Sequence, residues 1–201
     1  MVINDDPVLQ PSVSVGFGGF AAGVWGNMDL TEINNDRFEF NETDYFLEYT
    51  LDLPLLSLTL GISRYDYSIA GWEPTSEAYF AVAAGLPGNP SATVYRDVDK
   101  ADGTYVELGA GQDFPVMPFA NLEISAILGW GSGKHNRYNY GISGMGAGFT
   151  EVTVAAGLPV GIGDFVSVTP SLGLSCPLND DLRDEYDTVT AVFWVSASAS
   201  F

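Results

Sequence analysis

The sequence predicts an all-β protein, an up-and-down antiparallel transmembrane β-barrel, and three observations lead to this fold class. Apolar and polar residues alternate along runs of about ten residues, which is the length of a tilted barrel strand. The connections between these runs are short and long in turn, as they are in outer-membrane barrels. The run at residues 188–201 sets an apolar face against a largely hydroxylated one and ends on the aromatic Phe201, which is typical of a closing barrel strand.

Composition narrows the class of protein further. The 201 residues suit one domain, 1–201, and with 46% hydrophobic and 16% charged residues the chain is too apolar to be disordered. No run approaches the roughly eighteen apolar residues that a membrane helix needs. The formal charge of −19 excludes a nucleic-acid-binding protein, because phosphates would be repelled. The single Cys176 excludes an internal disulfide.

The amino-terminal half contains six candidate strands, at residues 12–17, 20–30, 44–53, 56–66, 77–86 and 91–99. Three of them present an unbroken apolar face at every second position. In run 44–53 this face is Tyr45, Leu47, Tyr49, Leu51 and Leu53. In run 56–66 it is Leu56, Leu58, Leu60 and Ile62, and in run 77–86 it is Ala78, Phe80, Val82, Ala84 and Leu86.

The carboxy-terminal half contains five more, at residues 104–113, 119–131, 149–158, 165–176 and 188–201. Their apolar faces alternate with Ser, Thr, Gly and acidic residues; in run 165–176 Leu172 and Leu174 face away from Ser171 and Ser175. None of the eleven runs sustains the three-and-four spacing of a helix. Each is therefore expected to be a strand with one face in lipid and one in the lumen.

Short connections fall at one end of the predicted barrel, and most long connections fall at the other. Those at residues 18–19, 54, 86–90, 115–118 and 159–164 are short and rich in Gly or Pro, whereas those at 31–43, 68–76, 131–148 and 177–187 are longer and polar. The connection at 100–103 is the one short exception. If Phe201 ends in the periplasm, every member of the first group lies on the periplasmic side, and the long loops lie outside the cell.

The strand count is odd, and bacterial single-chain barrels have even counts with both termini periplasmic. We therefore expect twelve strands in the complete protein, one of them amino-terminal to the eleven seen. The opening residues MVINDDPVLQ have no basic or apolar signal region. A signal peptide is accordingly expected upstream of Met1 together with that strand.

Two segments carry a family resemblance. Residues 7–17 read PVLQPSVSVGF and residues 19–30 read GFAAGVWGNMDL. With the Ser-rich closing strand, they resemble a group of uncharacterised bacterial outer-membrane β-barrel proteins, in which a Pro-x-Leu-Gln segment runs into a Gly-Phe…Val-Trp strand. Members of that group place another strand before this segment. The resemblance implies the fold and an outer-membrane location but no catalytic residue.

The polar faces of five different strands each carry a carboxylate, namely Glu48, Glu77, Glu107, Glu123 and Glu151. A lumen lined by one sign of charge favours the opposite ion, so these side chains are the candidate binding residues for cations. The alternative is that they are hydrogen-bonded in a plugged interior to tyrosines of the same faces, Tyr65, Tyr67, Tyr79, Tyr95 and Tyr105.

Three other polar residues have specific expected roles. Arg64 and Arg96 fall on lipid-facing positions near the long-loop end, where a guanidinium suits bidentate contact with lipid phosphates or simply extends to the interface. His135 is the only histidine, three residues from Ser132 in the longest loop. A triad needs partners from separate strands, so we expect a solvated histidine. No metal or cofactor motif is present.

These features predict a protein of the bacterial outer membrane that is not an enzyme. The leading hypothesis is a passive channel for small cationic or neutral solutes, with outer-membrane lipid and lipopolysaccharide as partners. One alternative is a closed structural or surface-interaction barrel with acidic extracellular loops. A third is a soluble all-β ligand-binding barrel.

Overall fold

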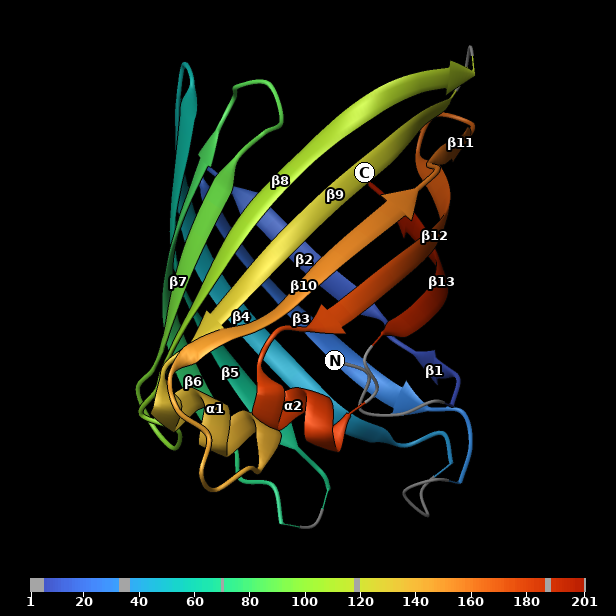
Figure 1. Ribbon diagram of the computed structural model, residues 1–201. Coiled ribbons are helices and arrows are strands. Elements are labelled where there is room, and N and C mark those ends of the chain that lie inside the picture. The colour runs from blue at the N-terminus through green and yellow to red at the C-terminus, as the bar shows by residue number, and fades with distance from the viewer. Residues whose placement is uncertain (1–5, 33–36, 70, 118–119, 187–188, 201) are drawn as a thin grey trace.

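The computed structural model describes residues 6–32, 37–69, 71–117, 120–186 and 189–200. In these ranges the protein is all-β: thirteen strands form one antiparallel sheet, and two short helices lie at one end of it (Figure 1). The strands are β1 Val8–Leu9, β2 Ser12–Phe17, β3 Phe20–Asp29, β4 Phe40–Leu53, β5 Leu56–Tyr67, β6 Thr75–Ala84, β7 Ser91–Asp97, β8 Thr104–Met117, β9 Ala120–Gly131, β10 Gly148–Gly157, β11 Val160–Ile162, β12 Val166–Pro177 and β13 Thr190–Ala199. The helices are α1 Gly133–Tyr140 and α2 Asp180–Glu185.

Each of the eleven predicted runs is one of the long strands, and each pairs with its neighbour in sequence. The two additional strands are very short: β1 pairs with β3 beyond the start of β2, and β11 pairs with β12. The predicted strand ends Phe119, Thr188 and Phe201 lie outside the described residues. The predicted all-β, up-and-down antiparallel order is therefore confirmed.

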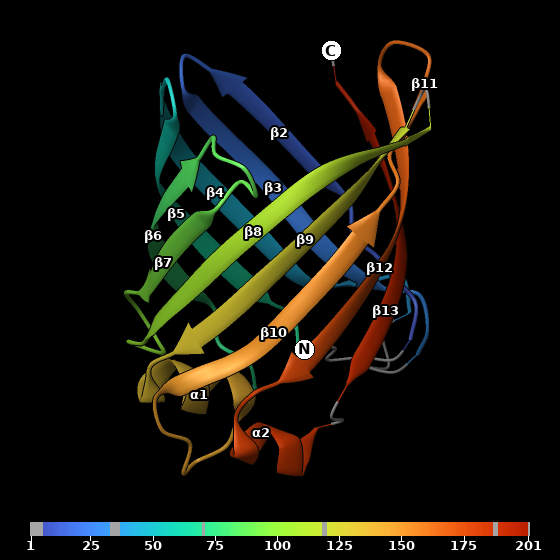
Figure 2. The ribbon, with the colours of Figure 1, turned by 45° about the horizontal axis from the view of Figure 1, so that its top comes forward.

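The sheet curls about a common axis, with the strands strongly tilted to it (Figures 1 and 2). Within the described residues, β2 pairs only with β3 and β13 pairs only with β12. No ladder therefore joins the first long strand to the last. Closure of the sheet into the predicted barrel is not seen in the described residues, and β2 and β13 are its two edge strands.

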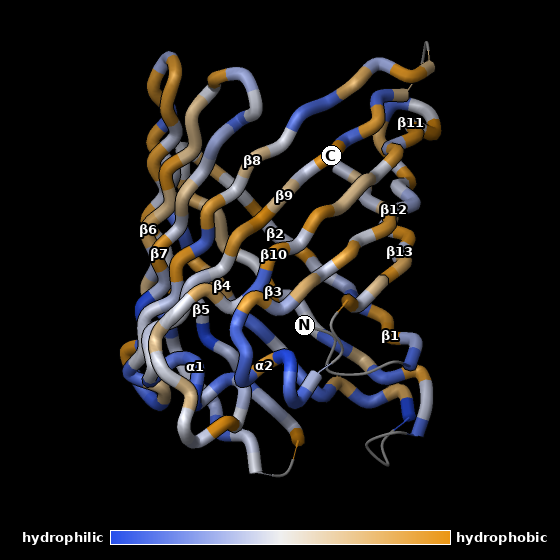
Figure 3. The backbone as a smooth tube through the Cα atoms, viewed as in Figure 1, coloured by the Kyte–Doolittle hydropathy of each residue, from blue (hydrophilic) through white to orange (hydrophobic). Residues whose placement is uncertain are grey.

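Apolar and polar residues alternate along the strands (Figure 3), and the exposed fractions of the apolar side chains indicate which face they cover. Leu47, Leu60 and Phe80 have the predicted outward parity and are 52%, 64% and 46% exposed. Among the described residues, the buried apolar side chains are only Ala101, Ala120, Met145 and Leu182. The large apolar residues therefore cover the outside of the sheet instead of filling an interior.

Both helices lie in connections that were predicted only as long polar loops. Ser132 caps α1 by accepting a hydrogen bond from the backbone N–H of His135, and Gly141 ends the helix with a φ of 70°. Asn179 caps α2 in the same way, accepting from the N–H of Asp181. In the described part of the chain neither helix has the length and apolar character to cross a membrane.

Candidate functional site

Three of the predicted lumen carboxylates accept hydrogen bonds from tyrosines on other strands. The phenol of Tyr79 donates to Glu48 Oε2 at 2.6 Å, and that of Tyr65 donates to Glu77 Oε2 at 3.0 Å. The phenol of Tyr95 donates to Glu107 Oε2 at 3.1 Å. The tyrosine–carboxylate pairing that the sequence left as an alternative is thus present on the inner face of strands β4 to β8.

The tyrosines also form a row of rings across the sheet. Tyr79, Tyr95 and Tyr105 stand directly opposite one another on β6, β7 and β8. Their ring centroids are 5.7 Å and then 6.2 Å apart. The row ends on the imidazole of His135, which stacks on Tyr105 at 4.7 Å with an interplanar angle of 15°. We call Tyr79, Tyr95, Tyr105 and His135 the ring row.

Helix α1 packs onto the end of the ring row, so His135 is not the solvated loop residue that was expected. It is only 9% exposed. A side chain at Gly103 would lie 2.5 Å from the backbone nitrogen of His135, and glycine at this position lets the helix approach the β7–β8 loop so closely. Asn136 is fully buried and donates from Nδ2 to the carbonyls of Gly131 and Gly146.

The environment of His135 favours the neutral imidazole. Burial lowers its pKa to about 4, although the nearby charge of Asp97 opposes the shift. Asn139 Nδ2 lies 3.2 Å from His135 Nδ1. Asp97 is 1% exposed and accepts from the Thr75 hydroxyl at 2.6 Å. Asp97 also accepts from the backbone N–H groups of residues 99 and 102, so it holds the β7–β8 loop in place beneath α1.

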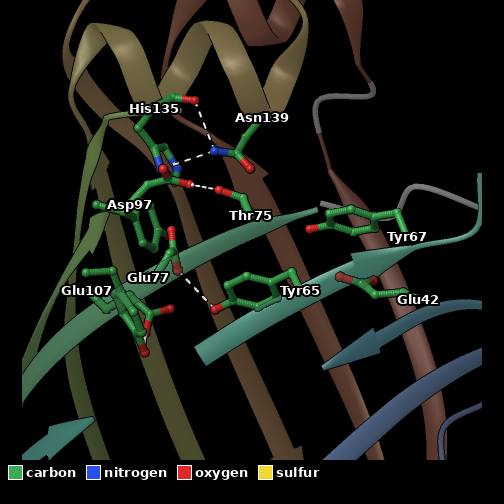
Figure 4. Close-up of a pocket in the computed structure, with 11 residues that line it drawn as sticks. Glu42, Tyr65, Tyr67, Thr75, Glu77, Asp97, Glu107, His135 and Asn139 are labelled. Carbon is green, nitrogen blue, oxygen red and sulfur yellow. Dashed lines mark hydrogen bonds between the residues drawn. The ribbon is translucent and has the colours of Figure 1, made fainter. Parts of the chain in front are cut away.

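A pocket of about 300 Å³ lies between α1 and the inner face of the sheet (Figure 4). Its acidic lining consists of Glu42, Glu77, Asp97 and Glu107, and its aromatic lining of Tyr65, Tyr67, Tyr95, Tyr105 and His135. Thr75 and Asn139 complete the lining, which contains no Lys or Arg. Carboxylates together with aromatic faces are the groups that bind organic or inorganic cations, and the volume suits a small solute.

The pocket gathers only two of the five predicted carboxylates, Glu77 and Glu107. Glu48 lies farther along the inner face. Glu151 lines a second, smaller hollow near α2 and accepts from the Ser175 hydroxyl at 3.2 Å. Glu123 is exposed and stands opposite Asp113 toward the short-turn end.

Arg64 and Arg96 face outward near the long-loop end, and their side chains are 44% and 49% exposed. Each already has a carboxylate partner. Arg64 Nε contacts Asp66 Oδ1 at 2.9 Å, and Arg96 pairs with Asp102. Contact between these guanidinium groups and lipid phosphates stays a prediction.

Sequence reasoning missed Glu42, Asp97 and His135 as pocket residues. Glu42 shares the parity of Glu48, but β4 begins four residues before its predicted start, so Glu42 was placed in a loop. Asp97 lies two residues after Tyr95 and therefore on the same face of β7, so its inward position could have been predicted from the sequence. His135 reaches the pocket only because α1 folds back over the sheet, which strand alternation does not encode.

The site has to be interpreted from its geometry, because the sequence comparisons with known proteins found no match. No protein-family model matches the chain, and no curated protein is significantly similar to it in sequence. In the ranges that the structure describes, no group of three or more His, Cys, Asp or Glu side chains is arranged to hold a metal ion. The pocket is therefore defined by its carboxylates and aromatic rings.

Proposed function

We propose that the protein is an outer-membrane β-barrel through which small cationic or neutral solutes pass passively. The observation that carries the proposal is the opposite character of the two faces of one sheet. The outer face is apolar, and the inner face is acidic and rich in tyrosine. This is the distribution of a barrel that is surrounded by lipid and filled with water.

The outer face supports the membrane location. Leu108, Val154 and Leu172 on β8, β10 and β12 are 48%, 46% and 50% exposed, as are large apolar residues on the other strands. Soluble monomers rarely expose contiguous apolar surface of this extent. The exposed apolar face therefore favours a membrane barrel over the soluble ligand-binding barrel.

The inner face supports a preference for cations. Of the seven Lys and Arg residues, five lie outside the strands and the other two, Arg64 and Arg96, face outward. Three carboxylates of the inner face, Glu48, Glu77 and Glu107, accept hydrogen bonds from neutral phenols. A lumen with this charge attracts cations and repels anions.

The basic residues also support an orientation. All seven lie at the long-loop end of the sheet: Arg37, Arg64, Arg96, Lys100, Lys134, Arg137 and Arg183. Guanidinium and ammonium groups bind phosphates, which lipopolysaccharide presents on the outer leaflet. The long loops accordingly belong outside the cell, with lipopolysaccharide and outer-membrane lipid as the proposed partners.

A second candidate is a closed barrel that acts through its loops. The observation that favours it is α1, which lies across the long-loop end above the pocket (Figure 4). The phenol–carboxylate bonds beneath it further narrow the interior. In this case the acidic loops would contact a surface partner, and the lumen would be structural.

Conductance of the purified protein in a planar bilayer decides between the two candidates. We expect discrete conductance steps, and in a salt gradient a reversal potential of the sign that a cation-selective pore gives. An anion-selective reversal potential would contradict the assignment of the inner face. A protein that inserts but never conducts would support the closed barrel.

A further inference from the structure

Aromatic rings form the walls of the pocket beneath α1, on the helix side as well as on the sheet side (Figure 4). On the sheet, Tyr95 stands directly opposite Tyr105, and their ring centroids are 6.2 Å apart. From the helix, His135 stacks on Tyr105 at 4.7 Å. Ring faces attract cations and also cover methylene groups. The pocket therefore suits a cation that carries hydrocarbon better than it suits a bare hydrated ion.

Among the described residues, no basic side chain lines the pocket. The two basic residues of α1 are used elsewhere: Lys134 pairs with Asp102, and Arg137 donates to the carbonyl of Met145 at 3.0 Å. The imidazole of His135 is neutral, because burial lowers its pKa. The carboxylates of the pocket thus create a negative potential that a cationic solute can balance.

Two of the four acidic residues of the pocket are available to such a solute at its centre. Asp97 is 1% exposed, and both of its carboxylate oxygens accept hydrogen bonds from the protein. Glu42 stands on β4, two strands from Glu77 on β6. Glu77 and Glu107 each accept a phenol hydrogen bond at Oε2. In the described part of the chain neither accepts one at Oε1, which leaves that atom for a bound solute.

The positions of Glu77 and Glu107 suit two separate positive charges. They lie on β6 and β8, with Tyr95 on β7 between them. Two strand spacings separate β6 from β8 by roughly 10 Å, and each carboxylate is held by a different tyrosine. In the described ranges, no three His, Cys, Asp or Glu side chains converge as metal ligands do. A flexible chain with a charge at each end matches this arrangement better than one metal ion.

We propose that the pocket binds a linear aliphatic diamine, with one ammonium group at Glu77, the other at Glu107 and the methylene chain against Tyr95. This inference rests on the proposed function and names the class of solute that the inner face selects. The pocket volume of about 300 Å³ equals that of roughly ten water molecules, which is enough for such a molecule. His135 and Asn139 line the same pocket, so the bound diamine contacts α1 as well as the sheet.

Isothermal titration calorimetry of the purified chain in detergent micelles tests the class of ligand. The probes are cadaverine, a linear diamine; n-pentylamine, which has the same carbon chain and one ammonium group; and Mg²⁺, which has the same charge and no chain. We expect cadaverine to bind at a single site at least about tenfold more tightly than either of the others, because only cadaverine contacts both carboxylates and the rings. Absence of cadaverine binding, or equal affinity for n-pentylamine or Mg²⁺, would overturn the proposal.

Charge-removing variants test the location. Glu77→Gln with Glu107→Gln keeps acceptor atoms for both tyrosines and should weaken cadaverine binding at least about tenfold. The matched control, Asp184→Asn with Glu185→Gln, removes two exposed charges from α2 outside the pocket and should leave the Kd unchanged. Equal affinities in the natural protein and the pocket variant, or an equal loss in both variants, would show that the pocket carboxylates do not hold the diamine.

Hydrogen exchange of the natural protein locates the diamine without any substitution. Because His135 and Asn139 line the pocket, a bound diamine stabilises the docked position of α1. Cadaverine at ten times its Kd should slow exchange of the α1 amides by up to about tenfold and leave the α2 amides unchanged. Binding that leaves α1 exchange unchanged would place the diamine elsewhere and overturn the site.

These measurements do not require a pore, so they separate the binding site from the proposed function. A protein that conducts cations in a bilayer and does not bind cadaverine would overturn the diamine site and leave the channel in place. A protein that binds cadaverine in the pocket and never conducts would retain the site and exclude passive passage.

Discussion

The ring of Tyr79 lies across Gly61 on the neighbouring strand. A side chain at Gly61 would place its Cβ atom 2.2 Å from Cζ of Tyr79, where no atom fits. By lying over this glycine, the phenol on β6 reaches past β5 and donates to Glu48 on β4 at 2.6 Å. Because Gly61 has no side chain, the hydrogen bond from Tyr79 can cross β5 and join β6 to β4.

Gly61→Ala should displace the ring of Tyr79 and break its hydrogen bond to Glu48. We expect a loss of about 2 kcal/mol in the free energy of unfolding, from overpacking and the loss of a part-buried hydrogen bond. The measurement is reversible urea unfolding in lipid vesicles. Gly161→Ala is the matched control, because a Cβ at Gly161 meets nothing within 4 Å. If Gly61→Ala is as costly in a Tyr79→Ala background, the ring is not the cause.

Glu77→Gln with Glu107→Gln should reduce cation selectivity. The double variant removes two negative charges from the pocket and keeps acceptor atoms for Tyr65 and Tyr95. A charge a few ångströms from an ion is worth about 1 kcal/mol in water, so the cation-to-anion permeability ratio should fall several-fold. Reversal potentials in a salt gradient give this ratio. Glu185→Gln in α2 should leave it unchanged, and an unchanged ratio in the double variant would mean that the pocket is not on the permeation path.

The docking of α1 should weaken in acid because His135 is buried as the neutral imidazole. Its pKa is about 4 in the folded protein and 6.5 when exposed, so the undocked state binds more protons between these values. Docking is therefore strongest above pH 6.5 and loses up to about 1.4 kcal/mol per pH unit as the pH falls toward 4. The surrounding groups are Asp97, Tyr105 and Asn139, and the charge of Asp97 moderates the loss.

Hydrogen exchange of the α1 amides, normalised for intrinsic rates, measures this docking. His135→Phe keeps a ring against Tyr105 and cannot titrate, so its protection should be nearly constant from pH 6.5 to 4. Equal acid sensitivity in the variant and the natural protein would assign the effect to another group.

Arg64→Gln with Arg96→Gln should reduce the amount of lipopolysaccharide that copurifies with the protein. Their present partners are exposed carboxylates, and exposed ion pairs contribute only about 0–1 kcal/mol, so stability should change little. Phosphate analysis of purified protein gives the measurement. Arg183→Gln, in α2 beyond the end of β12, tests whether the strand arginines contribute more than a basic residue outside the strands. Equal phosphate in all three proteins would remove the proposed role of the strand arginines.

The positions and faces of the strands could be predicted because side chains point to opposite faces at successive residues, a pattern that is visible in the local sequence. Leu47 and Glu48 could be assigned to opposite faces from their neighbours alone. The ring row could not be predicted, because Tyr79, Tyr95 and Tyr105 become neighbours only through the registers of β6, β7 and β8, which depend on loop lengths and tilt.

The helices were missed for a different reason. α1 has eight residues, mostly polar, too few for a hydrophobic period to be visible, and its caps Ser132 and Gly141 are also common loop residues. The burial of His135 follows from a tertiary contact with Tyr105. Sequence patterns therefore indicated the strands of the sheet, whereas the packing of α1 and His135 at its long-loop end could be seen only in the structure.

The ring row gives the protein a near-ultraviolet circular dichroism signal. Aromatic rings a few ångströms apart in a fixed, asymmetric arrangement produce near-ultraviolet circular dichroism, which disappears when tertiary packing is lost even if strands persist. Because one end of the row belongs to α1 and the rest to the sheet, this signal reports on the seating of the helix against the wall. The state of the long-loop end is thus visible in unlabelled protein, separately from the far-ultraviolet signal of the strands.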